Sequence, residues 1–421
     1  MAMLSALLRY MLVDEQQREA RLYDLAVDLS AGDYPPLTDA LVRQSRGRGL
    51  LRLPVPANVA ADRHRRRLCV EDLAAAAAPD PDWLAQAVLL KRDILDAMVV
   101  DLRERMAYRA NDLWIEEKDG RYVLTAVDVS FRAIIRRVSR GRIGDAPPRL
   151  LHDWRTTEFL RGDPLAAEAG RDYHRLIGRL PAGEIANLAD ALPYLHAAEL
   201  LMLLPDAKAA DTLESMMPER QLQVFEELAD SRARRLLSLM RPDIVADLLG
   251  RLEKDEARYW LEHMPALQYG RVLALLRYPE DTAGGIMTND LIALPAGVQA
   301  GAALGELRRK LGTPDFINFI HIVYVVDNPS DRRLQGVLSL RDLLVADEGK
   351  PLEEIMDPYV VALQPNEPAV KAARSVIENG LPALPVLGEA GELVGAVTVD
   401  AALTFATPAG WGRRQAPRLF S

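Results

Sequence analysis

The chain has 421 residues, 49% of them hydrophobic and 27% charged, which is an ordinary composition for a soluble protein. This length exceeds what one hydrophobic core normally serves and predicts two to four domains. Residues 1–150 are nearly neutral, whereas the remainder carries 28 Lys and Arg against 39 Asp and Glu. The acidic second part argues against nucleic-acid binding and suits cations. One cysteine excludes a disulfide framework and indicates a reducing compartment.

Membrane and enzyme signals are both missing from the sequence pattern. No apolar stretch reaches the length of roughly 18 residues that a transmembrane helix requires, and the apolar start "MLSALLRYMLVDE" has no signal-peptide cleavage site. We therefore expect a cytoplasmic protein, with peripheral binding to the inner face of a membrane left open. The histidines are scattered, and no zinc-ligand spacing, P-loop, nucleophile elbow or Cys/His pair occurs. We expect no enzymatic activity.

Residues 1–142 consist of predicted strands and turns in two similar halves. When Asp14 is aligned with Asp101, a Val-Asp pair, a charged turn, an Asp-Leu pair and a glycine turn recur in the same order. The Asp-Leu pairs begin at Asp24 and Asp112. Alternating apolar residues bounded by Gly, Asp and Pro are typical of β-hairpins, so the repetition predicts two copies of one small β unit.

The middle of the chain changes to a helical period, with apolar residues recurring at intervals of three and four. Prolines punctuate this pattern at Pro181, Pro193, Pro205, Pro218, Pro242 and Pro265. Proline is tolerated in the first turn of a helix but not in its middle, so each proline predicts the start of a short helix. Short helices cannot bury their apolar faces alone, and we expect them to stack as an α-solenoid.

A second repeat occupies residues 286–405. The segment "IMTNDLIALP" returns as "IMDPYVVALQ", and "HIVYVVDNPSDRRLQGVLSLRDLL" returns, shortened, as "LPALPVLGEAGELVGAVTVDAAL". Each copy predicts a strand, a helix, a strand, a turn, a strand and a helix. Between the solenoid and this repeat lies "YPEDTAGGIMT", where Glu280 and Asp281 precede a double glycine. We call residues 278–288 the joint.

These motifs resemble known families. The repeat over 286–405 resembles a tandem pair of CBS domains, and "LLPDAKAADTLESM", "YPEDTAGGIMT" and "GVLSLRDLLVAD" resemble the cytosolic half of MgtE-type magnesium channels. The two β units resemble PRC-barrel domains. The predicted fold class is therefore a multidomain α+β protein with two small PRC-like β-barrels, an α-superhelical domain and a CBS (βαββα) pair. The expected PRC-like units span residues 1–75 and 86–142, and a connector follows at 143–172. The superhelical domain is expected at 173–276, the two CBS domains at 284–345 and 352–406, and a tail at 407–421.

The resemblance to MgtE implies a magnesium site, because in that family Mg²⁺ bridges acidic residues of the superhelix and the CBS pair. The matching positions here are Asp211, Asp243 and Asp247, with the backbone carbonyl of Gly285 as a further ligand. Asp243 and Asp247 are four residues apart and share a helix face, where two negative charges repel unless a cation lies between them. A structural alternative stays open, because Asp243 suits the first turn of a helix and Gly285 suits a turn.

The CBS side of this site departs from the family pattern. The matching acidic positions of the second CBS repeat are occupied by Pro368, Val370, Gly380, Ala401 and Thr404. Only the neighbours Glu367, Glu378 and Asp400 are acidic. We therefore expect magnesium binding, if it is retained, to be weak.

CBS pairs often bind an adenosine nucleotide, and the first repeat keeps the corresponding signature. The candidate ligands for ATP, ADP or AMP are Gly336, Ser339, Arg341, Asp342 and, from the second repeat, Thr398. Ala401 stands where the second repeat should have its Asp, so at most one site is expected. The positions that would stack on adenine are aliphatic, Ile322 and Leu381. Ser339 and Asp342 also suit a helix cap, which leaves a structural alternative open.

The combined pattern predicts a regulatory protein that resembles the sensor of an MgtE channel. A pore would require several membrane helices after the CBS pair, and the chain ends soon afterwards in "TPAGWGRRQAPRLFS". We therefore expect it to act on a separate membrane channel or another protein partner, and to form a homodimer through the CBS pair. The alternative is a scaffold or adaptor whose CBS pair serves only for dimerisation.

Overall fold

A computed structural model of the chain describes residues 2–44, 49–55, 60–62, 67–70, 72–139, 150–164, 176–311 and 321–406. It divides into a first unit, Met1–Leu228, and a second unit, Ala229–Ser421. The predicted tail and parts of the predicted connector lie outside the described residues. Within the described residues, no helix combines the length and apolar character needed to cross a membrane.

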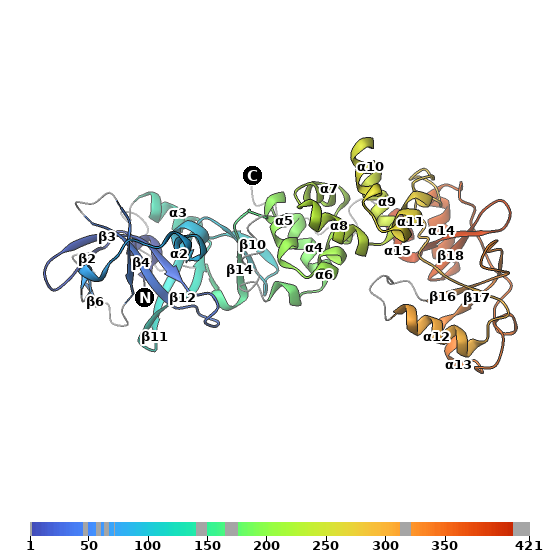
Figure 1. Ribbon diagram of the computed structural model, residues 1–421, viewed down its shortest axis with the longest axis horizontal. Helices are drawn as coiled ribbons and strands as arrows, with labels where there is room; N and C mark the ends of the chain where they lie inside the picture. The colour runs from blue at the N-terminus through green and yellow to red at the C-terminus, as the bar shows by residue number, and fades with distance from the viewer. Residues whose placement is uncertain are drawn as a thin grey trace. The chain divides into compact units, whose positions relative to one another are not determined.

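The first unit begins with β structure (Figure 1). Its elements are β1 (Ala2–Met3), α1 (Leu4–Leu7), β2 (Met11–Val13), β3 (Glu19–Val27), β4 (Leu37–Gln44), β5 (Leu51–Pro54), β6 (Ala60–Asp62), β7 (Arg67–Cys69), η1 (Leu73–Ala75), α2 (Pro81–Gln86), β8 (Val88–Leu89), η2 (Leu90–Ile94), β9 (Met98–Asp101), β10 (Met106–Arg109), β11 (Asp112–Lys118), β12 (Arg121–Asp128), α3 (Phe131–Val138), β13 (Leu151–Asp153), η3 (Trp154–Thr156) and β14 (Thr157–Leu160). The sheet orders are β5-β4-β3-β2-β7-β6 with β8 beside β3, β1-β11-β12-β13, and β10-β9-β14. In the described strands these pairings leave the sheets open.

The two sequence repeats of this region exchange strands. β1 of the first repeat pairs with β11 of the second, and β8 of the second pairs with β3 of the first. Asp24 accepts hydrogen bonds from two backbone N–H groups of η2, and Asp112 accepts one from the backbone N–H of Ser5 in α1. Asp14 directly follows β2 and Asp101 ends β9, and each accepts N–H bonds from the following turn. Because both repeats also share one hydrophobic core, they are halves of one interleaved β domain.

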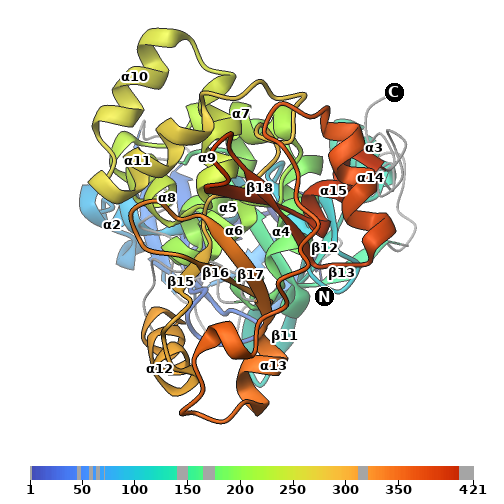
Figure 2. The same ribbon diagram turned by 90° about the vertical axis from the view of Figure 1, so that its right-hand side faces the viewer.

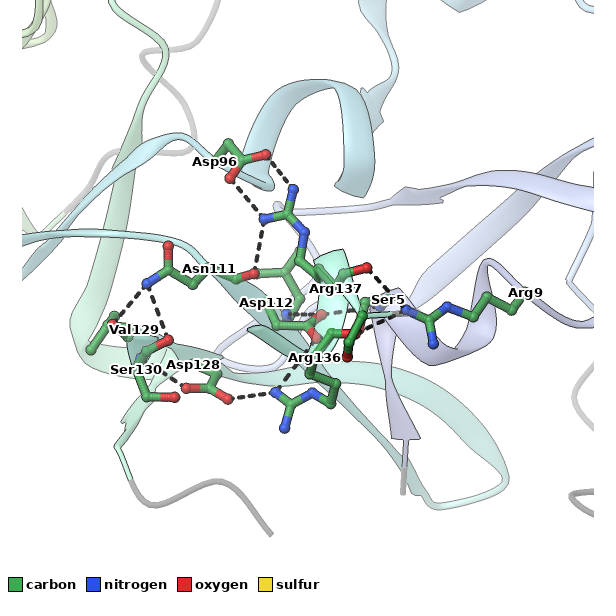
Figure 3. Close-up of polar contacts among 12 residues, drawn as sticks. Ser5, Arg9, Asp96, Asn111, Asp112, Asp128, Val129, Ser130, Arg136 and Arg137 are labelled. Atoms are coloured by element: carbon green, nitrogen blue, oxygen red, sulfur yellow. Dashed lines mark hydrogen bonds and ion pairs between the residues drawn. The ribbon is translucent and has the colours of Figure 1, made fainter. Parts of the chain in front are cut away.

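Helix α3 is fastened to this domain by a buried charge network (Figure 3). Nη2 of Arg136 lies 2.8 Å from Oδ2 of Asp128 and 3.7 Å from Oδ2 of Asp112. Burial raises the pKa of Asp112, while hydrogen bonds from Ser5 and the charge of Arg136 oppose that rise. The buried charges are therefore paired, as a low-dielectric interior requires.

Short helices follow, divided between the two units. The first unit contains η5 (Ile177–Arg179), α4 (Ala182–Ala191), α5 (Tyr194–Leu203), α6 (Asp206–Glu214) and α7 (Pro218–Glu226), and the second contains α8 (Asp230–Leu239), α9 (Pro242–Gly250), α10 (Lys254–Glu262) and α11 (Ala266–Leu275). Each of the six marker prolines is the N-cap or the first residue of a helix, which confirms the prediction. The buried carboxylate of Glu199 in α5 accepts hydrogen bonds from the backbone N–H groups of Arg161 and Gly162, which fastens α5 to the segment after β14.

The CBS pair completes the second unit (Figure 2). Its elements are β15 (Ile292–Pro295), α12 (Ala300–Leu311), β16 (Ile322–Val326), β17 (Leu334–Ser339), α13 (Leu340–Val345), η6 (Leu352–Glu354), α14 (Ala369–Asn379), β18 (Ala383–Leu387), β19 (Leu393–Thr398) and α15 (Val399–Ala406). β15 runs parallel to β16, and β17 is antiparallel to it. In the second repeat, β18 pairs with β19, and the first strand is reduced to one parallel bridge between Leu363 and Val386.

The CBS repeats are locked together through their signature glycines. A Cβ on Gly336 would lie 2.7 Å from the sulfur of Met356, and a Cβ on Gly395 would lie 2.4 Å from the sulfur of Met287. Each glycine therefore accepts the methionine that begins the other repeat. Side chains of β16, β18 and β19 form a core common to both repeats. The predicted internal symmetry is thus present as reciprocal packing.

Candidate functional site

The joint is hydrogen-bonded to the second CBS repeat, directly before α14. The N–H of Ala283 donates to the carbonyl of Glu367 at 2.7 Å, and the N–H of Gly284 donates to that of Pro365 at 2.8 Å. In return, the N–H of Ala369 donates to the carbonyl of Asp281 at 2.8 Å. Because of these three hydrogen bonds, any movement of α14 must either displace the main chain of the joint or break the bonds.

The double glycine is required by close packing. A Cβ on Gly285 would lie 2.1 Å from the carbonyl oxygen of Pro279, and a Cβ on Gly284 would lie 2.5 Å from the ring of Tyr278. Real side chains do not tolerate such distances, so the tight turn excludes any larger residue. This accounts for both glycines without a ligand. The role of the Gly285 carbonyl as a metal ligand stays a prediction.

The last solenoid helix is also attached to the segment that follows the joint. Nη1 of Arg271 in α11 lies 3.1 Å from Oδ1 of the buried Asp290. Nδ2 of Asn289 donates to the carbonyl of Arg271 at 2.8 Å. Thr288 and Ala396 exchange two backbone hydrogen bonds of 2.9 Å, which attach the same segment to β19. The solenoid end, the joint and the CBS pair are therefore physically connected within the second unit.

An acidic group lies beside the joint at α9. The pKa of Asp247 rises from its ordinary 3.8 to about 6, first because burial desolvates the carboxylate and next because Asp243 is negatively charged. Glu280 of the joint raises the same pKa by its charge, and Arg251 and Arg241 oppose the rise. Oδ1 of Asp243 is buried and accepts no hydrogen bond from any described residue. Carboxylate oxygens in this state are suitable ligands for a hard divalent cation.

The predicted magnesium ligands lie in both units, and the ligand role of Asp211 stays a prediction. Asp243 and Asp247 occupy one face of α9 as the spacing predicts, whereas Asp211 lies in α6 of the first unit, where burial raises its pKa. Glu280 of the joint acts on Asp247 by its charge, although the sequence pattern predicts no such role for it, and the donor atoms of Asp243, Asp247 and Glu280 do not all lie within 4.8 Å of one another. On the CBS side, the carboxylate of Glu367 accepts from the N–H of Gln364 and pairs with Lys371 at 3.0 Å. Its pKa is lowered, with burial as the largest, opposing contribution.

The candidate nucleotide ligands of the first repeat form a helix cap. Oγ of Ser339 accepts from the N–H of Asp342 at 3.0 Å and donates to Oδ2 of Asp342 at 2.6 Å. Arg341 and Asp342 are exposed at the start of α13, so a ligand can reach both side chains. In the absence of a ligand, the cap engages the hydroxyl of Ser339 and the carboxylate of Asp342. Binding of ribose or phosphate would therefore have to replace a local hydrogen bond.

The remaining nucleotide candidates are less accessible. Thr398 is 5% exposed, and its hydroxyl accepts from the N–H of Ala401 at 3.2 Å, which caps α15. Ile322 is part of the core shared by the two repeats, whereas Leu381 is 41% exposed. The signature residues thus lie at equivalent places of the two repeats. In the first repeat Arg341 and Asp342 are exposed, whereas Gly336 is buried.

Exposed apolar side chains gather on the helices of the second CBS repeat. Val370 and Ile377 of α14 are 59% and 40% exposed, and Leu403 and Phe405 of α15 are 45% and 41% exposed. The two helices pack side by side in Figure 2. An exposed apolar surface of this kind is typical of a protein interface.

A further group of potential metal ligands escaped the sequence prediction. Donor atoms of Asp101, Glu104 and His152 lie within 4.8 Å of one another in the interleaved β domain. Nδ1 of His152 is 2.6 Å from Oδ2 of Asp101, and the hydroxyl of Tyr108 donates to Glu104 at 2.6 Å. These contacts give the side chains of the group hydrogen-bond partners within the protein. They also fasten β13 to the turn after β9. Asp101 and His152 lie far apart in the sequence, so their spacing carries no signal of a shared site.

Comparison with known proteins places these features in context. Residues 180–281 match the MgtE intracellular N domain, and residues 352–406 match the CBS domain. The magnesium transporter MgtE of Thermus thermophilus is 39% identical over 233 residues, which are 55% of this chain and 51% of the relative. MgtE of Bacillus subtilis is 28% identical over 230 residues, 55% of this chain and 50% of the relative. The chain thus spans about half the length of these curated relatives.

Two solved structures are similar to the same region. The cytosolic domain of the Mg²⁺ channel MgtE in complex with ATP has 35% sequence identity and a TM-score of 0.52, and the match covers 56% of this chain and 94% of that one. The soluble part of a magnesium transporter has 26% identity and a TM-score of 0.51, with 57% and 93% covered. The similarity extends over nearly the whole of each of the two solved structures and over a little more than half of this chain.

Proposed function

We propose that this chain, in which an MgtE intracellular N domain is joined to a CBS pair, is a regulatory protein that senses a divalent cation at the joint. Mg²⁺ is the cation that the relatives suggest. Its ligands would be Asp243, Asp247 and Glu280. The observation that supports this proposal most strongly is the raised pKa of Asp247.

The chemistry of the acidic group fits a cation. At neutral pH the ionised form of Asp247, which burial and the charges of Asp243 and Glu280 disfavour, gains from a positive charge beside it. Mg²⁺ prefers oxygen ligands and keeps several waters, so two or three carboxylates suffice. Because the acidic ligands of the second CBS repeat are replaced, few carboxylates remain to hold the cation. We therefore expect millimolar affinity, which corresponds to about 4 kcal/mol of binding free energy.

The joint offers a route from this site to the CBS pair. Glu280 is adjacent to Asp281, whose carbonyl accepts the hydrogen bond from Ala369 at the start of α14. A cation that draws Glu280 towards α9 would act on the same strip of main chain. The proposed signal is a change in the position of α14. This change would also move the exposed apolar surface on α14 and α15. Through that surface the chain would form a homodimer.

We further propose that the first CBS repeat binds an adenosine nucleotide weakly, through Ser339, Arg341 and Asp342. The complex of a similar MgtE cytosolic domain with ATP supports this ligand class. Arg341 would pair with phosphate, and the Asp342 carboxylate would accept from ribose hydroxyls once the Ser339 cap is released. The proposed partner is a membrane channel subunit at the cytoplasmic side of a membrane. The alternative is a scaffold whose CBS pair only dimerises.

Ligand-dependent stability separates a sensor from a scaffold. A ligand that binds only the folded protein at ten times its Kd stabilises it by about 1.4 kcal/mol. For a unit of this size that is a rise of roughly 3–6 °C in Tm. Differential scanning calorimetry of the full chain with MgCl₂ or ATP should give this rise. Unchanged Tm at 20 mM of each ligand would favour the scaffold.

A further inference from the structure

A cavity lies inside the interleaved β domain of the first unit. Its volume is about 270 Å³, and its walls come from β1 to β5, β7, β11 and β12, thus from both sequence repeats. Protein interiors are packed as densely as organic crystals, and voids larger than a water molecule are few. A space of this size is therefore more than imperfect packing of a core that only has to fold.

The lining of the cavity is apolar with a polar rim. Leu12 and Leu22 are each 3% exposed and Ile115 is 1% exposed, so this part of the wall is deep in the domain. The polar side chains that line the cavity are those of Tyr10, Tyr122 and Glu117. Glu117 is exposed and therefore marks the end that faces water. A water molecule needs two to four polar partners, which the apolar wall does not provide.

We propose that this cavity binds one small apolar molecule with an aromatic or short alkyl body and a neutral or positively charged end at Glu117. Ligand pockets typically combine apolar walls with a few polar groups that fix orientation. An engineered apolar cavity of about 150 Å³ accepts benzene, so the volume here suits a body of roughly two fused rings. The carboxylate of Glu117 repels an anionic end. This inference is independent of the cation and nucleotide proposals, which concern the second unit.

Tyr122 strengthens the assignment of the polar end. Burial and the charge of Glu117 raise the pKa of its hydroxyl, so it stays protonated at neutral pH. The rim therefore presents a neutral hydroxyl of Tyr122 beside the carboxylate of Glu117. Such a pair recognises an ammonium or hydroxyl group and disfavours a carboxylate or sulfonate.

The first test uses the neutral fluorophore 1-naphthylamine, whose body is two fused rings, with the full chain. We expect saturable enhancement of fluorescence with one site per chain. Ala40→Phe should weaken the affinity at least tenfold, because Ala40 is a buried wall residue of β4 and the added ring occupies the cavity. Val55→Trp fills the same space from a half-buried position and replaces Ala40→Phe if that variant loses its cooperative melting transition. Equal binding by the parent and a folded filled variant would overturn the proposal.

The second test addresses the charge of the ligand. 1-Naphthylmethylammonium and 1-naphthoate have the same ring system and opposite charges, and each can displace the fluorophore. We expect the ammonium compound to compete at least tenfold better with the parent. Glu117→Gln should abolish this preference, and Glu15→Gln, which removes an exposed charge outside the lining, should keep it. Equal competition by the two compounds with the parent would overturn the role of Glu117.

Discussion

Replacing Asp247 by Asn should stabilise the second unit at neutral pH. The folded protein holds the pKa of Asp247 at about 6 against an ordinary value of 3.8, and one pKa unit corresponds to about 1.36 kcal/mol. The ionised carboxylate thus costs up to about 3 kcal/mol, and screening at this half-buried position reduces the cost to roughly 1–2 kcal/mol. We expect the Tm of Asp247→Asn at pH 7.5 to exceed that of the parent by about 2–8 °C.

The sign of the pH dependence follows from the direction of the shift. Because folding raises the pKa of this acid, the folded state binds the proton more tightly than the unfolded state. The contribution to stability is fully present below pH 3.8 and is lost as the pH rises through about 6. Stability from this group should therefore fall between pH 4 and pH 7 in the parent, and Asp247→Asn should lack that component.

Calorimetry at pH 5.0 and 7.5, with and without 20 mM MgCl₂, measures both effects. Magnesium should raise the Tm of the parent more at pH 7.5, where Asp247 is ionised, and Asp247→Asn should lose most of this gain. Asp255→Asn is the matched control, because its side chain is 97% exposed and the charge change is the same. If Asp247→Asn has the same Tm as the parent and keeps its magnesium response, the acidic group at α9 is only a solvated helix face.

Three further predictions concern the nucleotide site, the solenoid contact and the dimer. Asp342→Ala should abolish ATP binding in calorimetric titrations, whereas Thr398→Ala should weaken it less; the reverse order would contradict the assignment to the first repeat. Arg271→Met removes the 3.1 Å ion pair with a buried carboxylate and should lower unfolding free energy by about 1.5–3 kcal/mol, measured by urea denaturation. A loss no larger than that of an ordinary surface substitution, about 0.5 kcal/mol, would show that this pair does not fasten α11. Val370→Glu should shift the chain from dimer to monomer in light scattering, and a parent that is already monomeric at micromolar concentration would refute the proposed interface.

Local patterns predicted the elements of this fold well. Proline positions predicted the starts of six helices, because proline fits only the first turn of a helix and this restriction is local. The internal repeats gave the equivalence of Asp14 with Asp101 and of the two CBS signatures. The strand exchange in the interleaved β domain was not predictable, because β1 and β8 are very short strands and each pairs with a strand distant in the sequence.

The candidate sites were predictable only in part. The four-residue spacing of Asp243 and Asp247 identified a shared helix face, but the charge effect of Glu280 on Asp247 depends on the fold and had no such signal. Ser339 and Asp342 form the helix cap that the sequence left open as a structural alternative, and their role as nucleotide ligands stays a prediction. The cavity could not be foreseen, since its walls combine leucines, valines and alanines that read as ordinary core residues.

The central claim is that a cation bound beside α9 acts on the joint. Hydrogen–deuterium exchange of the full chain, with and without 20 mM MgCl₂ at pH 7.5, tests this claim most directly. The account predicts slower exchange of the amides of Ala283, Gly284 and Ala369, which bond the joint to the second CBS repeat, and no such change in Asp243→Asn/Asp247→Asn. Equal exchange of these amides with and without magnesium in the parent would contradict it.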